Sequence, residues 1–407
     1  MTTSLPPDPR HSPDAPAEVP PGPGNPRLIE IIRRAIAVGG GRITFADFMG
    51  LALSHPEFGY YRSPERRPGR SGDFLTAPET TPYFGFMLAR QLAECWERLG
   101  RPAPFTVREL GSGVGGLAYD IIAALLDNLP ELRAALVYRL AEPNPYRQAE
   151  ALAAMDQAGL GDIVVIEGTD LPTDQPVEPI TGVVLANEVA DALPVHRLVV
   201  RDGGLAERYV TWRDGSFAET EAGVSDPALG DPLAERLRGE GVVLTEGDRL
   251  DVSPSSVGWF RSAARGLARG YLLTIDYGYP AAELYRGHRL AGTLRTYAGH
   301  VAGDDPFVRV GEQDLTAHVD FSALITGGEA EGLTLAGLTP QARFLERLGL
   351  GQVLLDAQDT PGMTTTEYIA LRSAIFRLID PGGMGRFHVL AMARDAPVAP
   401  PLLGFGP

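Results

Sequence analysis

The stretch Phe105-Thr-Val-Arg-Glu-Leu-Gly-Ser-Gly-Val-Gly-Gly-Leu117 decides the fold. Its apolar first half predicts a strand, its glycines predict a tight turn, and the residues as far as about Leu129 predict a helix. Glycine has no Cβ, so the backbone at Gly111, Gly113 and Gly115 can bend sharply and approach a ligand closely. The helix directs its free N–H groups and the positive end of its dipole toward the turn.

A second strand, Val137-Tyr-Arg-Leu-Ala-Glu142, ends on a carboxylate that can accept both hydroxyls of a ribose. Strand, turn, helix and carboxylate together indicate an adenosine-containing cofactor at the carboxyl edge of a parallel sheet. Two spacings fit. Gly111, Gly113 and Gly116 match the dinucleotide pattern G-x-G-x-x-G, whereas Glu109 and the first three glycines match the E-x-G-x-G-x-G loop of S-adenosylmethionine (SAM) enzymes.

The composition is that of a globular enzyme, with 407 residues, 44% of them hydrophobic and 22% charged. A formal net charge of -16 disfavours nucleic acid and suits a basic protein partner. Cys95 is the single cysteine, so disulfides within the chain are excluded, and its helical surroundings indicate a buried apolar role. The histidines lack metal-ligand spacing, so we predict no metal site. Without an apolar run of spanning length or a signal sequence, we expect a cytoplasmic protein with no membrane insertion.

The chain divides by composition into four parts. Residues 1–25 are rich in proline and predict a disordered tail. We expect an N-terminal helical or lid segment at 26–104 and a cofactor-binding domain at 105–395, with an insertion around 197–250. Residues 396–407 predict a C-terminal tail. Alternating strands and helices from Phe105 onward favour a doubly wound α/β fold.

Polar residues follow two of the predicted core strands. The apolar run Ile180–Ala186 ends in Asn187 and Glu188, and Gly270–Ile275 ends in Asp276 and Tyr277. Open α/β sheets bind ligands at this edge. Two final strands, Gly332–Leu335 and Arg386–Met392, predict an antiparallel pair, and Leu198–Val200 with Ala206–Trp212 predict a hairpin around Asp202.

Several motifs in one order resemble the MidA-type complex I assembly methyltransferases and their bacterial relatives, which are class I SAM-dependent methyltransferases. They cover most of the chain from about Ile43 to Ala393: Gly72-Asp-Phe-Leu-Thr-Ala-Pro-Glu79, Glu109-Leu-Gly-Ser-Gly, Ala186-Asn-Glu with Asp191-Ala-Leu-Pro-Val195, Ile275-Asp-Tyr-Gly, Gly292-Thr-Leu-Arg-Thr-Tyr, and Asp314-Leu-Thr-Ala-His-Val-Asp-Phe321.

The resemblance implies a Rossmann-like, doubly wound seven-strand sheet and SAM as the cofactor. It also implies a basic, arginine-bearing protein segment as the methyl acceptor, which in the mitochondrial members lies on a subunit of a respiratory complex. The chain departs from the family in two places. Ser112 and Val114 stand where the glycine loop usually reads G-P-G-R-G, and Val189-Ala190 stands in place of an aromatic pair, which removes bulk near the acceptor.

We expect the cofactor to contact Asn187 and three further groups of residues. The glycine turn, with Glu109 and Ser112, would admit the methionine end, Glu142 would take the ribose and Asp170 the adenine. Gly72 and Asp73 belong to a segment that would close over the cofactor as a lid.

Glu188 is the candidate acceptor-orienting carboxylate, with Asn187 and Asp191 beside it. A carboxylate can pair bidentately with a guanidinium and direct one nitrogen at the methyl group. The alternative is that Asn187 and Glu188 only cap a following helix. At the level of the whole protein, an NAD-dependent oxidoreductase and a non-catalytic assembly factor are the competing interpretations.

Overall fold

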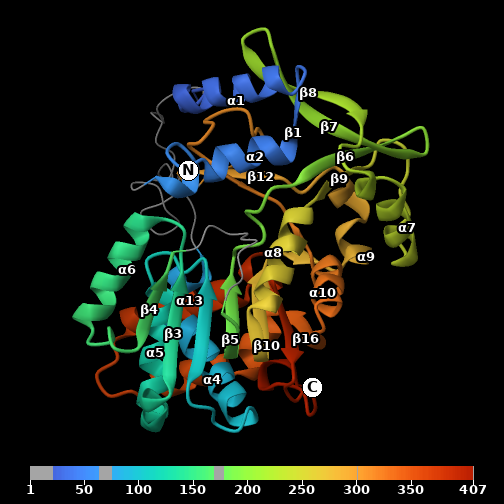
Figure 1. Ribbon diagram of the computed structural model, residues 1–407. Coiled ribbons are helices and arrows are strands. Elements are labelled where there is room, and N and C mark those ends of the chain that lie inside the picture. The colour runs from blue at the N-terminus through green and yellow to red at the C-terminus, as the bar shows by residue number, and fades with distance from the viewer. Residues whose placement is uncertain (1–21, 64–75, 169–177, 300, 407) are drawn as a thin grey trace, which may run out of the picture.

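The computed structural model describes residues 22–63, 76–168, 178–299 and 301–406. Three of the predicted cofactor-binding residues, Gly72, Asp73 and Asp170, lie outside these ranges. Within the ranges, two lobes can be distinguished, one built on a seven-stranded sheet and the other on a five-stranded sheet (Figure 1).

The larger sheet confirms the predicted doubly wound α/β fold. Its strands, in spatial order, are β16 (Thr334–Pro340), β17 (His388–Arg394), β10 (Leu267–Asp276), β5 (Ile180–Asn187), β2 (Phe105–Leu110), β3 (Leu136–Ala141) and β4 (Val164–Glu167). The five strands from β10 to β4 are parallel, and β17 runs antiparallel to both of its neighbours. The predicted final antiparallel pair is therefore confirmed.

Helices cover both faces of this sheet because alternate residues of each strand point to opposite sides. One face packs against α4 (Tyr83–Arg98), α5 (Gly116–Asn128), α6 (Pro145–Gln157), α11 (Gln341–Arg347), α12 (Leu350–Gln358) and α13 (Thr365–Ile379). The other face packs against α8 (Pro254–Arg265) and α10 (Phe321–Ala330). On β10, for example, Leu273 and Ile275 belong to the first core and Leu272 to the second. Helices α11 to α13 are additional to the elements predicted from sequence.

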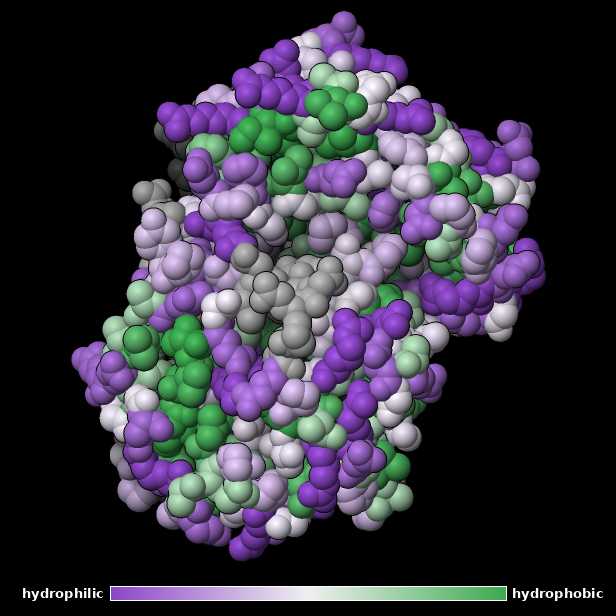
Figure 2. Space-filling model, in the orientation of Figure 1, coloured by the Kyte–Doolittle hydropathy of each residue, from purple (hydrophilic) through white to green (hydrophobic). Residues whose placement is uncertain are grey.

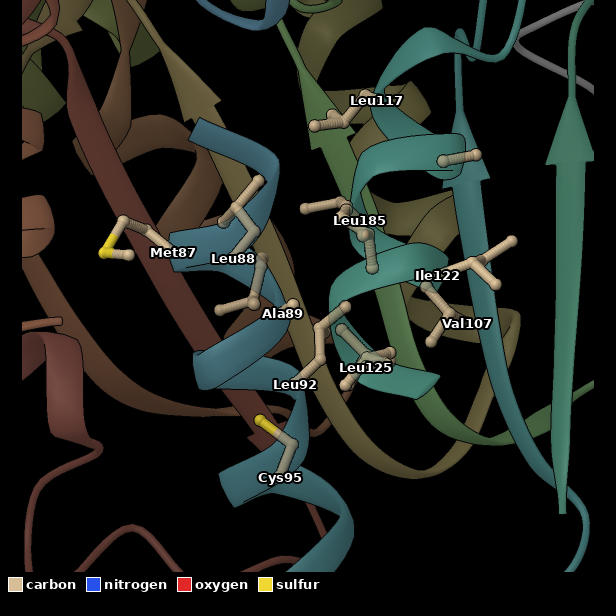
Figure 3. Close-up of a cluster of buried hydrophobic side chains, with 14 of the residues drawn as sticks. Met87, Leu88, Ala89, Leu92, Cys95, Val107, Leu117, Ile122, Leu125 and Leu185 are labelled. Atoms are coloured by element: carbon tan, nitrogen blue, oxygen red, sulfur yellow. The ribbon is translucent and has the colours of Figure 1, made fainter. Parts of the chain in front are cut away.

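Figure 3 shows the first of these cores. Met87, Leu88 and Leu92 of α4 point toward the sheet alongside the side chains of α5. Cys95 on the same helix is fully buried in this cluster, which confirms its predicted apolar role. Burial of such side chains, worth roughly 1.5–3 kcal/mol each, holds α4 and α5 against the strands that carry the glycine turn.

The smaller lobe joins the N-terminal helices to the inserted residues. Its antiparallel sheet contains β1 (Ile43–Thr44), β7 (Gly204–Arg213), β6 (His196–Arg201) and β9 (Arg249–Val252), with β8 (Ser216–Gly223) on the far side of β7. The predicted hairpin at Asp202 is confirmed as β6–β7. Side chains of α1 (Pro26–Val38) and α2 (Phe45–Ser54), such as Ile32 and Phe48, share a core with Val210 and Phe217. The insertion and the chain's beginning thus form one structural unit.

The remaining elements are short or lie outside the two main sheets. They are η1 (Tyr60–Arg62), α3 (Ala77–Thr80), η2 (Pro130–Ala134), η3 (Pro227–Leu229), α7 (Asp231–Gly239), β11 (Gly278–Tyr279), α9 (Ala281–Leu284), η4 (Gly287–Leu290), β12 (Arg295–Ala298), β13 (Val301–Gly303), β14 (Asp314–Thr316), β15 (Val319–Asp320), η5 (Met384–Arg386) and η6 (Leu403–Phe405). The face seen in Figure 2 is mostly hydrophilic over both lobes, with hydrophobic residues in small groups. No helix in the described ranges has the length and hydropathy needed to cross a bilayer.

Candidate active site

The glycine turn has the geometry that its sequence predicts. Gly111, Gly113 and Gly115 have φ angles of 69°, 57° and 80°, a left-handed region that favours glycine. Gly115 is the N-cap of α5, which begins at Gly116. The turn therefore connects β2 to a helix N-terminus whose free N–H groups suit a polar or anionic ligand group.

The turn packs directly against the loop that follows β5. A Cβ placed on Gly111 would lie only 2.8 Å from Cγ2 of Val189, so glycine is needed here for close approach as well as for φ. Val189 is the residue after Glu188. The predicted cofactor turn and the predicted acceptor loop thus meet at one edge of the sheet.

Glu142 lies beside the turn at the end of β3. Its carboxylate accepts hydrogen bonds from the backbone N–H of Gly113 (2.9 Å) and of Asn144 (2.8 Å), and the residue is 4% exposed. Burial raises the pKa of Glu142, an effect opposed by Arg147 and by these hydrogen bonds. Each carboxylate oxygen can accept more than one hydrogen bond, so capacity remains for two ribose hydroxyls.

Two further observations fit a cofactor at this turn. The hydroxyl of Ser112 is buried and lacks a hydrogen-bond partner within the described part of the chain. Such a group in the turn calls for a ligand partner, because an unpaired buried hydroxyl is costly. Glu109 lies on β2 below the turn and accepts a hydrogen bond from the Tyr138 hydroxyl (2.8 Å). Burial raises the pKa of Glu109 to about 8.

Glu188 occupies a strained corner. Its φ angle is 52°, a left-handed conformation that few non-glycine residues adopt. Its backbone N–H donates to the carbonyl of Ile275 (2.8 Å). Its Oε1 accepts from the N–H of Ala77 (3.1 Å) and from Asn187 Nδ2 (3.1 Å). Because Ala77 starts α3, the described end of the predicted lid segment touches the candidate carboxylate.

The helix-cap interpretation of Asn187 and Glu188 is wrong. Residues 188–195, all of them described, form bends and turns that lead into β6, and no helix begins there. Burial raises the pKa of Glu188 to about 8, opposed by its hydrogen bonds and assisted by the charge of Asp191. Strain and desolvation of this kind are concentrated at functional sites.

Asp276, at the end of β10, holds the loop that carries Glu188. Its Oδ2 accepts from three successive backbone N–H groups, those of Val189 (3.2 Å), Ala190 (2.9 Å) and Asp191 (3.3 Å). Asp276 is fully buried, and burial together with the charges of Asp191 and Glu188 raises its pKa well above the usual range. The sequence marked Asp276 only as a polar strand end, yet its contacts make it the positioning residue for Glu188.

Asp191 contributes a second carboxylate beside this corner. It is 6% exposed, and its Oδ1 has no hydrogen-bond partner in the described ranges. Burial raises the pKa of Asp191 to about 6, although the nearby Tyr277 hydroxyl opposes the shift. Burial, assisted by the charge of Asp191, raises the pKa of Tyr61 and of Tyr297, both of which belong to segments outside the core strands. Carboxylates and phenols from both sides of the sheet edge therefore gather here.

Tyr61 and Asp314 extend this acidic wall toward the smaller lobe. The Tyr61 hydroxyl donates to Asp314 Oδ1 at 2.9 Å, and Tyr297 lies opposite Asp314 in the β12–β14 pair. The sequence predicts no role for Asp314, because only the folded chain brings β14 into contact with η1. Nowhere in the described ranges do three or more His, Cys, Asp or Glu side chains gather as a metal site.

These features define a SAM-dependent methyltransferase. The model of a family described as S-adenosyl-L-methionine-dependent methyltransferases matches residues 87–339, and the chain belongs to that family. This finding decides against the NAD-dependent oxidoreductase. It also makes the protein an enzyme with SAM as its cofactor, as the sequence predicted.

Curated relatives confirm the MidA-type resemblance. The protein arginine methyltransferase NDUFAF7 homolog, mitochondrial, of Drosophila melanogaster is 29% identical, with 94% of this chain and 88% of the relative covered. The human protein arginine methyltransferase NDUFAF7, mitochondrial, is 27% identical over 86% of this chain and 80% of its own. A Burkholderia thailandensis crystal structure bound to S-adenosyl-homocysteine is 32% identical, with a TM-score of 0.81 and coverage of 93% and 94%.

Proposed function

We propose that this enzyme transfers the SAM methyl group to a nitrogen of an arginine side chain in a basic protein segment. The observation that carries the proposal is the contact between Gly111 and Val189, which sets the acidic corner at Glu188 against the cofactor turn. The relatives named protein arginine methyltransferases support the same acceptor.

The charge balance at the corner favours a cationic acceptor. Glu188, Asp191 and Asp276 form no ion pair within the described ranges. Burial without a neighbouring cation raises the pKa of each carboxyl group. Buried carboxylates without a cation are costly, so a positively charged ligand would bind there with a large gain. A guanidinium offers several N–H donors in one plane and fits two carboxylates better than a compact ammonium does.

The chain's own residues would position the acceptor. Glu188 would pair with the guanidinium and fix its plane, and Asp191 would accept a further N–H. When bound, SAM supplies a sulfonium methyl, so that an N–C bond forms while the C–S bond breaks and its electron pair returns to sulfur. The nitrogen releases one proton, which Glu188 can accept because the bound guanidinium keeps its carboxylate ionised and in contact with the N–H.

We assign the cofactor contacts as predicted. Gly111, Ser112, Gly113 and Gly115, with Glu109 below, would hold the methionine end, and Glu142 would hold the ribose. Asn187 would contact both cofactor and acceptor. The roles of Gly72, Asp73 and Asp170 stay predictions, as do a cytoplasmic location and an acceptor on a respiratory complex subunit.

Mass spectrometry of methyl marks tests the acceptor. Cells lacking the protein would be complemented with the wild-type enzyme or with Glu188→Gln, and their proteomes compared. We expect methylarginine at one or a few sites with the wild-type enzyme and none with the variant. Marks confined to lysine, to carboxylates or to small molecules would contradict the arginine assignment but leave the methyltransferase class intact.

A peptide pair sharpens the result. Once a marked site is known, the same peptide with lysine in place of arginine serves as the matched control. The planar, two-carboxylate geometry predicts turnover of the arginine peptide alone. Equal turnover of both peptides would show that charge, and not the guanidinium shape, is recognised.

A further inference from the structure

A cavity lies apart from the glycine turn. It encloses about 450 Å³ and is bounded by α7, α8 and α10, which lie together on the right of Figure 1. Gly111, Glu142 and Glu188 are not among its lining residues, although Ala190 and Ala317 form part of its wall. This volume is within the range of small-molecule sites.

The walls of the cavity are largely apolar. Leu229 and Leu233 line it from the side of α7, Val257 from α8 and Ala323 from α10. Apolar surface of this kind would gain about 25 cal/mol for each Å² that a ligand shields from water. The walls therefore favour a ligand that is mostly hydrocarbon.

The charged side chains in the wall already have partners. Arg236 pairs with Asp320 at 2.7 Å and with Glu240 at 3.0 Å, and Arg261 pairs with Glu331 at 2.7 Å. These pairs leave neither wall arginine without a counterion. An anionic ligand would therefore have to displace an existing carboxylate.

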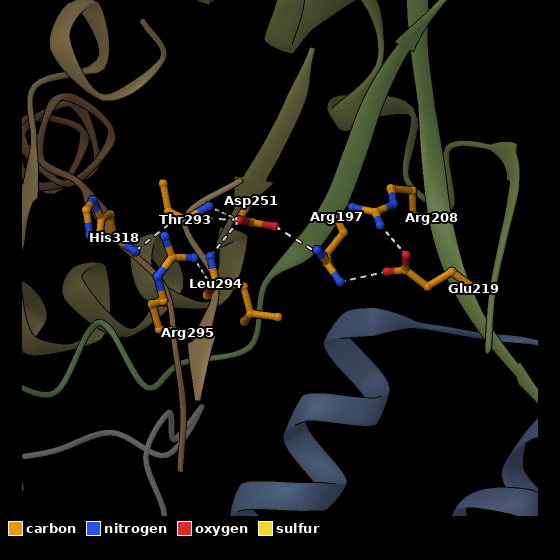
Figure 4. A network of polar contacts seen from close by, with 8 residues as sticks. All are labelled: Arg197, Arg208, Glu219, Asp251, Thr293, Leu294, Arg295 and His318. Carbon is orange, nitrogen blue, oxygen red and sulfur yellow. Dashed lines mark hydrogen bonds and ion pairs between the residues drawn. The ribbon is translucent and has the colours of Figure 1, made fainter. Parts of the chain in front are cut away.

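Of the remaining charged groups of the wall, Asp251 is buried and also has partners, whereas Asp226 is exposed to solvent. Asp251 accepts from the N–H groups of Thr293 and Leu294 and pairs with Arg197 at 3.4 Å, as Figure 4 shows. Asp226 accepts from the N–H of Ala228 at 2.8 Å. A cationic ligand would thus find no buried carboxylate without an arginine partner in the described wall, and the solvent-exposed Asp226 offers it little Coulomb energy.

Two neutral groups in the wall remain unpaired. The Tyr285 hydroxyl and His318 Nδ1 are buried and have no hydrogen-bond partner in the described ranges. Burial and the nearby Asp320 carboxylate raise the pKa of Tyr285 well above its usual value, so the phenol keeps its proton and can donate. Burial and the nearby arginines lower the pKa of His318 to about 4, so the imidazole is neutral. Unpaired buried groups of this kind are costly unless a ligand meets them.

We propose that this cavity is a binding site for an uncharged, largely apolar small molecule that carries one hydrogen-bonding group. The hydrocarbon body would pack between α7, α8 and α10, and the polar group would meet Tyr285 or His318. The cavity adjoins the acceptor loop at Ala190 but is not lined by Gly111, Glu142 or Glu188, and the proposal does not depend on the identity of the acceptor.

Calorimetric titration of the full chain with 2-naphthol tests the proposal, with 2-naphthoate as the charged analogue. We expect saturable binding of naphthol with a Kd below about 1 mM and at least ~10-fold weaker binding of naphthoate, because its charge has no counterion. Tyr285→Phe should weaken naphthol binding roughly 2- to 10-fold by removing one hydrogen bond. Unchanged affinity in that variant would overturn the assigned polar contact.

Filling the cavity provides the spatial test. Ala323→Phe should abolish naphthol binding. Ala370→Phe should not change it, because Ala370 is exposed on α13 and does not line the cavity. Binding of S-adenosyl-homocysteine reports whether each variant is folded. Naphthol that fails to saturate, or that still binds Ala323→Phe with wild-type affinity, would overturn the site.

Discussion

The carboxylates of the two lobes differ in whether they pair with an arginine. In the smaller lobe, Glu219 bridges Arg197 and Arg208, and Glu221 pairs with Arg201 at 2.8 Å (Figure 4 shows the first network). At the carboxyl edge of the large sheet, Glu188, Asp191 and Asp276 have no ion pair in the described ranges. Arg201 lowers the pKa of Glu221, whereas burial raises the pKa of Glu188 to about 8.

The difference distinguishes carboxylates that stabilise the fold from carboxylates that are available to a cationic ligand. Paired carboxylates hold strands β6 to β9 together and leave no charge to be neutralised. Unpaired, buried carboxylates reduce the stability of the free protein, and a cationic ligand can recover that cost. Within the described ranges, the acidic residues therefore indicate a cation-binding site only where they have no arginine partner.

The largest expected effect comes from Glu188→Gln, which keeps the shape of the unpaired carboxylate and removes its charge. Methyl transfer to an arginine peptide should fall at least ~100-fold, while affinity for S-adenosyl-homocysteine stays near wild type. Glu219→Gln, the matched change in the paired lobe, should keep most of the activity. Equal losses in the two variants would remove the functional distinction between the lobes. Radiolabelled methyl transfer and calorimetry provide the measurements.

A smaller loss is expected for Asp276→Asn. An amide can no longer accept three backbone N–H groups equally well, so the loop bearing Glu188 should shift. We expect kcat to fall roughly 10- to 100-fold, since displacements of about 1 Å have such effects, with little change in cofactor affinity. Asp251→Asn is the control, because Asp251 also accepts successive backbone N–H groups but in the paired network. A full-rate Asp276→Asn enzyme would remove its positioning role.

The contact between the turn and the acidic loop predicts energetic coupling. Gly111→Ala adds a Cβ 2.8 Å from Val189 and strains φ, whereas Gly113→Ala only strains φ, because no atom lies within 4 Å of its Cβ. The left-handed conformation costs roughly 1–2 kcal/mol in each variant. Adding Val189→Ala should recover about 1 kcal/mol of unfolding free energy for Gly111→Ala and nothing for Gly113→Ala. Denaturant titration of the wild type, the three single variants and the two double variants measures this coupling.

The smallest expected effect is on stability and has opposite signs in the two lobes. The Glu188 pKa rises from 4.5 to about 8 on folding, so the folded state retains a proton and loses stability as pH increases between these values. Glu188→Gln should therefore stabilise the protein by about 1–2 kcal/mol at pH 9 and by less at pH 5. Glu219→Gln should destabilise it at both pH values by about 1–3 kcal/mol. Stabilisation at pH 9 by both substitutions would contradict the comparison.

Much of the large lobe could be predicted because its signals are local. The glycines of the turn need left-handed φ angles, the apolar runs at β2 and β5 need a buried sheet, and polar residues at strand ends must meet at one edge. The position of Glu188 and Asp191 after β5 therefore predicts that their loop lies beside the turn, and the contact between Val189 and Gly111 confirms that placement of the loop. The wrong interpretation, a helix cap at Asn187, came from the usual pattern of a helix after each parallel strand.

By itself, the sequence determined the sheet, the cofactor and the chemical class, because periodicity, glycine spacing and motif order are properties of neighbouring residues. Only the tertiary structure decided that Asp276 holds the loop bearing Glu188, that Asp314 and Tyr61 meet, and that the insertion shares a core with α1 and α2. Those contacts join residues far apart in the chain. Ion pairing between residues far apart in the chain depends on packing. The sequence therefore gives the number of carboxylates, and the fold shows which of them, in the described ranges, have no counterion.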